Sequence, residues 1–194
     1  MSNAAAQIVV RRLHEAHKYV LKMAGKLDDE KLRWHANAVS PSILFHVWHL
    51  GRWADRVQST VPGLTPALGA LLPPGQELWD TEGIATAWAF DDAKLGNGRT
   101  GSGMTDQDAQ ALPFPSTDLV VGYVSRAFES VEAAFNAIDD EQMVQPAKLK
   151  TAHGPLHEII CGEIMSSHLA HVSRHLGMIE ALIGVQGERG TATM

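Results

Sequence analysis

Apolar side chains recur every three or four residues in four long stretches of the chain, and polar residues fill the positions between them. In the first stretch Leu13, Val20 and Leu27 fall on one side of a helix that turns by about 100° per residue. Lys18 and Lys22 fall on the other side, as is typical of an amphipathic helix. The stretches predict four helices, at about residues 4–27, 40–60, 116–138 and 153–184.

Residues that favour helix ends flank these stretches. Ser40 is the expected N-cap of the second helix, with Pro41 in the first turn, where its missing N–H costs no hydrogen bond. Ser116 or Thr117 is the expected cap of the third helix, and Pro155 suits the first turn of the fourth. No segment shows convincing strand alternation. The pattern therefore predicts an all-α fold, a four-helix bundle.

The segment between the second and third helices, residues 61–115, is unusually long for a connection within a bundle. It contains six of the nine prolines. We expect short helical turns at 76–90 and after Thr105, where Thr105 and Asp108 form a cap pair. A crossover of this length lets the second and third helices run in the same direction, and such excursions usually serve a function. We expect one domain over residues 1–194, with 61–115 as an irregular excursion within it.

Composition narrows the classes of function. The net charge is −6 and no cluster of Lys and Arg marks a nucleic-acid-binding face. A single cysteine, Cys161, excludes an internal disulfide and suits a reducing compartment. We find no secretory leader pattern at the start and no apolar run near the roughly 20 residues that span a bilayer. These features predict a cytoplasmic protein with no nucleic-acid or membrane partner.

Histidines supply the most suggestive chemistry. Five of the ten fall in two helical windows, and neighbours three or four residues apart share a helix face. These five are His46, His49, His168, His171 and His175. Neutral imidazole is a common metal ligand, and bundle cores aim side chains from facing helices at one point. Three protein ligands would leave one position open for water or substrate. By spacing alone, a metal site and a set of half-buried histidines remain equal alternatives.

Two of these stretches resemble a known family. "SPSILFHVWHLGRWADRV" is similar to the second helix, and "SSHLAHVSRHLGMIEALIG" to the fourth helix, of the DinB-like superfamily. This superfamily of four-helix bundles includes mycothiol- and bacillithiol-dependent transferases and isomerases. The resemblance implies a divalent metal ion held by His49, His171 and His175, with His46 as the alternative to His49. Ni²⁺, Zn²⁺ and Fe²⁺ all suit such a set of ligands.

The resemblance also implies a reaction class. We expect a metal-dependent transferase or isomerase that uses a low-molecular-weight thiol and an electrophilic substrate. The alternative is a stress-related, metal-binding dimeric bundle without catalytic turnover, and a homodimer suits either interpretation. No residue is assigned as catalytic, and Asp55 and Glu163 are the candidates for an acid or base near the metal.

Other side chains differ in how well they suit the same site. Cys161 precedes His171 by ten residues, or about 15 Å along a helix, which is too far for a ligand. We interpret His168 as pocket wall or rim packing. Arg52, Arg99 and Arg174 are candidates to bind an anionic substrate.

Overall fold

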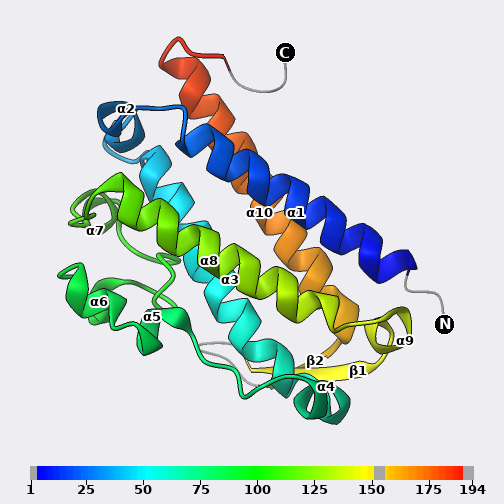
Figure 1. Ribbon diagram of the computed structural model, residues 1–194. Helices are drawn as coiled ribbons and strands as arrows, with labels where there is room; N and C mark the ends of the chain where they lie inside the picture. Colours follow the sequence, from blue (N-terminus) through cyan, green and yellow to red (C-terminus); the bar gives the residue numbers. More distant parts are fainter. Residues whose placement is uncertain (1–3, 151–155, 190–194) are drawn as a thin grey trace.

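Four long helices form the body of the molecule, which is described here by a computed structural model covering residues 4–150 and 156–189 (Figure 1). The helices are α1 (Ala4–Ala24), α3 (Ile43–Thr60), α8 (Thr117–Asn136) and α10 (Cys161–Val185). Helices α3 and α8 run in the same direction and antiparallel to α1 and α10 (Figure 1). The predicted all-α four-helix bundle with a long crossover between its second and third helices is confirmed.

The second bundle helix begins later than the sequence predicted. Ser42 rather than Ser40 is the N-cap of α3, and its Oγ accepts a hydrogen bond from the Phe45 N–H. Pro41 therefore precedes the helix. Both serines are good caps, but only Ser42 places its hydroxyl against a free N–H of the first turn. The third helix starts at Thr117 after Ser116, as expected.

Short elements fill the crossover and the ends of the bundle. They are α2 (Asp29–Arg33), η1 (Val61–Gly63), α4 (Pro66–Leu71), α5 (Leu78–Thr81), α6 (Ile84–Ala87), η2 (Asp92–Lys94), α7 (Asp106–Gln110) and α9 (Asp140–Met143). The helical turns expected within 76–90 are α5 and α6. The Thr105 side chain accepts from the Asp108 N–H at the start of α7, so the predicted cap pair is confirmed.

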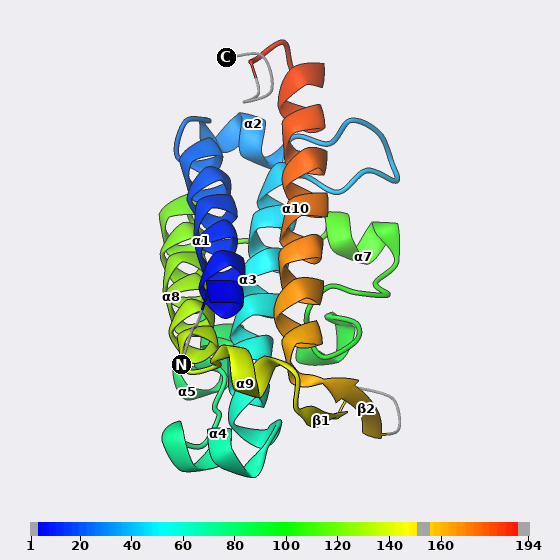
Figure 2. The same ribbon diagram turned by 90° about the vertical axis from the view of Figure 1, so that its right-hand side faces the viewer.

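A small hairpin precedes α10 and was not predicted. Strand β1 (Pro146–Lys150) pairs antiparallel with β2 (Leu156–Ile160), and Pro146 lies opposite Ile160. The fourth helix accordingly begins at Cys161, several residues later than expected, because the backbone of residues 156–160 bonds to a neighbouring strand. Pro155, the expected first-turn residue, lies outside the described residues. Figure 2 shows the hairpin at the end of the bundle opposite α2.

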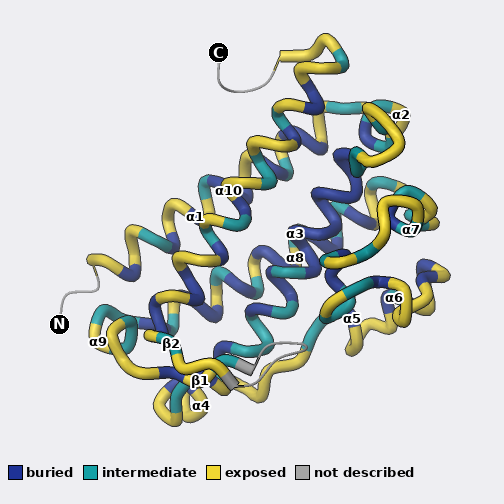
Figure 3. The backbone as a smooth tube through the Cα atoms, turned by 180° about the vertical axis from the view of Figure 1, so that it is seen from behind, coloured by how far each residue is buried: buried dark blue, intermediate teal, exposed yellow. Residues whose placement is uncertain are grey.

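Helix α3 lies at the centre of the molecule. Every residue from Ile43 to Arg52 is buried, because α1, α8 and α10 pack around the helix and the crossover covers its remaining side (Figure 3). An aromatic cluster joins the crossover to α3 and α8; its rings are Trp48, Trp79, Trp88, Phe90, Phe114 and Tyr123. No described helix is both long and apolar enough to cross a membrane.

At Gly51, α3 packs closely against α8. A Cβ atom at this position would lie 2.6 Å from the Val124 Cγ2 atom. We expect Gly51→Ala to lower the free energy of unfolding by about 1–3 kcal/mol, because the two backbones must separate. Gly177→Ala in α10 is the matched control, since its Cβ would meet no atom within 4 Å. Urea denaturation measures both, and a Gly51→Ala variant as stable as the Gly177→Ala variant would contradict the close contact.

Candidate metal centre

Three histidines from two facing helices meet near the middle of the bundle. His49 comes from α3, and His171 and His175 lie one turn apart on α10. One ring nitrogen from each lies within 4.8 Å of the others, and the Nε2 atoms of His49 and His171 are 3.1 Å apart. Three nitrogen donors this close together could hold a metal ion. The structure thus brings together the three residues that the sequence singled out.

A backbone carbonyl fixes the orientation of His49. Its Nδ1 atom lies 2.6 Å from the Thr100 carbonyl oxygen. A carbonyl oxygen only accepts, so Nδ1 carries the proton and the Nε2 lone pair is directed toward His171. This arrangement matches metal-bound histidines generally, whose second ring nitrogen donates to a carbonyl or carboxylate. The His49 side chain therefore suits a metal ligand.

His46, the alternative helix-two ligand, lies beside the group of three rather than within it. Its Nδ1 atom is 3.0 Å from Nδ1 of His175. If the Nδ1–H of His175 donates to Nδ1 of His46, the Nε2 lone pair of His175 remains available to a metal ion, as it does in His49. His46 is thereby placed to orient His175.

Burial keeps these imidazoles uncharged. Burial, followed by the charge of neighbouring histidines, lowers the pKa of His49 to about 3. The pKa values of His46, His171 and His175 are each lowered to about 4, again chiefly by burial. Arg174 contributes to lowering the pKa of both α10 histidines. All four rings are neutral at pH 7, which is the form that binds a metal.

His168 and Cys161 lie outside the group of three. His168 is buried, contacts His17 and Phe135 edge-on, and its Nε2 atom has no hydrogen-bond partner among the described residues. Cys161 is buried at the first residue of α10, and burial raises the pKa of its thiol. The thiol is thus both remote from the histidines and held protonated.

Arg52 has a structural role, and the expectation that it binds an anionic substrate is wrong. Its side chain is fully buried and donates to Asp55, Glu77 and Tyr123 at 2.6–2.9 Å. Its Nε atom also donates to the Arg99 carbonyl at 2.9 Å. This bond fixes the loop at Arg99, and the carbonyl of the next residue, Thr100, accepts from His49. Arg52 therefore helps to orient His49 indirectly, through this loop.

Asp55 likewise has a structural role. It is buried, and its carboxylate accepts from the Arg52 side chain, the Tyr123 hydroxyl and the N–H groups of Leu78 and Trp79. These bonds anchor the start of α5 against α3. A carboxylate surrounded by donors in this way does not act as an acid or base at the histidines.

Arg99 also turns away from the histidines. Its guanidinium lies 2.6 Å from an Asp80 oxygen and 3.3 Å from Asp92, and these contacts raise its pKa. Neither Arg52 nor Arg99 lines the cavity described next. Of the three candidate arginines, Arg174 alone borders it.

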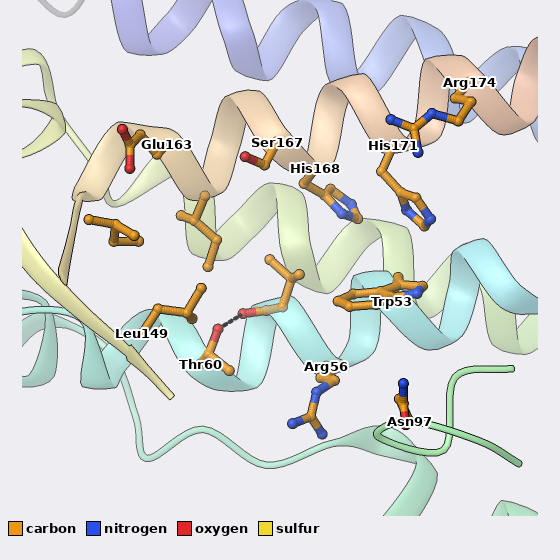
Figure 4. Close-up of a pocket in the computed structure, with 13 residues that line it drawn as sticks. Trp53, Arg56, Thr60, Asn97, Leu149, Glu163, Ser167, His168, His171 and Arg174 are labelled. Atoms are coloured by element: carbon orange, nitrogen blue, oxygen red, sulfur yellow. Dashed lines mark hydrogen bonds between the residues drawn. The ribbon is translucent and has the colours of Figure 1, made fainter. Parts of the chain in front are cut away.

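A cavity of about 600 Å³ opens beside His171. It lies between α3 and α10, with the hairpin at one end and the 95–104 loop near the histidines (Figure 4). The Trp53 ring forms part of its wall, with its centroid 5.4 Å from that of His171. A volume of this size is typical of small-molecule sites. A ligand in the cavity would reach the exposed side of His171.

Comparisons with known proteins give the family. The model of the DinB superfamily matches residues 12–179, which include all four long helices in whole or in part. The chain belongs to the DinB superfamily. A solved structure, described as a conserved protein of a locus from Enterococcus faecalis, is similar at a TM-score of 0.66 and 15% identity. The match covers 95% of this chain and 99% of that one, and at this identity it shows the shared fold alone. Comparison with curated proteins gave no match.

Sequence reasoning missed the parts of the site that come from loops and from the hairpin. The Thr100 carbonyl is a backbone group, so the residue type at this position does not predict its hydrogen bond with His49. Arg56 and Leu149 reach the cavity from α3 and β1, and only the folded positions of those elements reveal this. The glycines around Thr100 were the available signal, because Gly101 has a φ of 91° and lies against His49.

Proposed function

We propose that this DinB-superfamily protein binds a divalent metal ion through His49, His171 and His175. The observation that carries the proposal is the meeting of three neutral imidazoles, with the His49 Nε2 lone pair directed into the group by the Thr100 carbonyl. Zn²⁺, Ni²⁺ and Fe²⁺ are the candidate ions, because each accepts imidazole nitrogen.

We further propose that the protein is a metal-dependent transferase or isomerase acting on a low-molecular-weight thiol and an electrophile. A divalent ion at this site would favour the thiolate form of a bound thiol at neutral pH. The protein's own contribution is orientation and exclusion of water: Trp53 shields His171, and His46 and Thr100 fix the rings. The thiol must come from a second molecule, because Cys161 is buried away from the histidines.

Cobalt substitution tests this proposal directly. We expect Co²⁺-loaded protein to change its visible spectrum when a small thiol such as cysteine or glutathione is added, because the thiol enters the open coordination position. The His157→Ala variant, which removes an exposed histidine of β2, should respond in the same way. Conjugation assays with thiols and electrophiles then test turnover. If Co²⁺ binds and no thiol alters its spectrum, the chain is a metal-binding bundle without thiol chemistry.

A further inference from the structure

Apolar side chains from four elements line the cavity beside His171. They are Trp53 and Val57 of α3, Leu149 of β1, Ile159 of β2 and Ile164 of α10. The rest of the chain buries Trp53, Leu149 and Ile159 only in part, although all three pack against the core. Part of this apolar surface therefore faces the cavity, and a bound molecule that covered it would remove it from water.

Arg56 is one of three charged residues among the described ones that line the cavity, and its charge is directed elsewhere. Its guanidinium lies 3.5 Å from the Glu77 carboxylate. The same group packs on the backbone of the crossover, because a Cβ atom at Gly98 would lie 3.0 Å from the Arg56 Cζ atom. Figure 4 shows Arg56 on the side of α3 that faces away from α10. This arginine is thus held by the crossover and does not enter the space between the two helices.

The other two charged residues, Glu163 and Arg174, lie at the rim. Both are exposed to solvent on α10. The Glu163 carboxylate accepts from the Ile160 N–H at 3.3 Å, where it caps the first turn of the helix. Figure 4 shows the Arg174 guanidinium beside α10, outside the space between α3 and α10. Water therefore solvates both charges, and neither forms part of the apolar wall.

The polar groups that remain in the wall are uncharged. The Thr60 hydroxyl donates to the Val57 carbonyl at 2.8 Å, so its proton is already used (Figure 4). Asn97 contributes a neutral amide from the loop that also supplies the Thr100 carbonyl. An ion that entered this cavity would lose water without gaining a partner of opposite charge, which is unfavourable.

We propose that this cavity binds an uncharged, largely apolar molecule of the class of medium-chain aliphatic alcohols and carbonyl compounds. Its chain lies along Val57, Ile164 and the hairpin, and its polar group lies at the end near His171. An extended chain suits the cavity, because the lining residues Glu163 and His171 are about 12 Å apart along α10, at 1.5 Å per residue. Binding depends on the cavity alone. That this molecule is the electrophile beside the metal ion rests on the function proposed above.

Calorimetric titration of metal-free and metal-loaded full-length protein with 1-butanol, 1-hexanol and 1-octanol tests the proposal. We expect affinity to rise about fourfold per methylene in both forms, as apolar area is buried. In the metal-free protein octanoate should bind about tenfold or more weakly than 1-octanol, because the cavity offers its carboxylate no cation.

Two neighbouring residues of β2 provide a matched pair of variants. Ile159→Asp places a charge in the cavity wall and should weaken 1-octanol binding about tenfold or more. Ile160→Asp is the control, because successive side chains of a strand point to opposite faces and Ile160 is 48% exposed. It should bind 1-octanol as the wild type does. Leu149→Ala, a milder change in the same wall, should weaken binding about fivefold, and circular dichroism checks that each variant is folded.

Several results would overturn the assignment. They are octanoate binding to the metal-free protein as tightly as 1-octanol, affinity that does not depend on chain length, and equal 1-octanol affinity in the Ile159→Asp and Ile160→Asp proteins. Metal uptake without any binding of 1-octanol would keep the metal function and exclude this ligand. Chain-length-dependent binding by a protein that takes up no divalent metal would support the ligand and exclude the metal function.

Discussion

His171→Ala should abolish stoichiometric binding of a divalent metal. The substitution removes one of three nitrogen donors, and it leaves a gap on the side that faces the cavity. Loss of an outer hydrogen-bond partner alone costs metal sites about 10–100-fold in affinity, so we expect the loss of a ligand to exceed that. His175→Ala should have the same effect. Metal content after dialysis, measured by elemental analysis, and affinity by competition with a chelator give the result.

His157→Ala provides the matched control, because it removes an imidazole that is exposed on β2. It should retain the metal content of the wild type. Wild-type stoichiometry in both the His171→Ala and His175→Ala variants would rule out the site. Thermal denaturation adds a second readout: metal should raise the melting temperature of the wild type by mass action and leave that of His171→Ala unchanged.

The two histidines of α3 should differ in this experiment. His49→Ala should lose the metal as His171→Ala does, since it removes a member of the group of three. His46→Ala should weaken binding by about 10–100-fold, as expected when an orienting partner is lost. The reverse order would exchange their roles and make His46 the ligand.

Periodicity predicted the four long helices well because burial dominates there. In α8, Val120, Val124, Ala127 and Val131 repeat at helical spacing and all become core, so the pattern and the packing carry the same information. The hairpin was missed because its two strands are short and partly apolar, and five such residues do not distinguish a strand from a helix start. Its pairing partner, rather than its own sequence, decides its conformation.

Helical spacing placed the histidines on shared helix faces, and the family resemblance then implied His49, His171 and His175 as the ligands among them. Arg52 was misinterpreted. Its position one turn after His49 suggests access to the site, but its direction depends on α5 and Glu77, which approach from the crossover. The ion-pair partner of a charged residue on a central helix comes from the segment that covers that helix. Here that segment is the crossover, residues 61–115, which has no hydrophobic periodicity from which its position could be predicted.

Acid should unfold the metal-free protein through the same histidines. In the unfolded chain each imidazole titrates near its usual pKa of about 6.5. In the folded chain the pKa of His49 is lowered to about 3, and the pKa values of His46, His171 and His175 are lowered to about 4. Between these values the unfolded state binds more protons, so stability is fully present above pH 6.5 and is lost as pH falls toward 4.

The size of this effect follows from the number of protons. One buried histidine changes the free energy of unfolding by at most about 1.4 kcal/mol per pH unit in this interval. Four histidines together give a slope several times larger. The contributions of His171 and His175 are smaller, because water reaches these two side chains. Urea denaturation of chelator-treated protein from pH 7.5 to 4.5 should show a steep fall in the free energy of unfolding. His46→Phe, which keeps a ring in a buried position without a titrating group, should flatten that fall.

Metal ion should oppose the acid effect, because it binds only the neutral rings and only in the folded chain. Free imidazoles would release the ion as pH falls through about 6.5. Since burial lowers the pKa values of these four rings to about 3 and about 4, occupancy should persist to well below pH 6. Elemental analysis across the same pH series measures it. A metal-free protein equally stable at pH 7.5 and 4.5 would show that these histidines are already solvated, and metal loss centred on pH 6.5 would lead to the same conclusion.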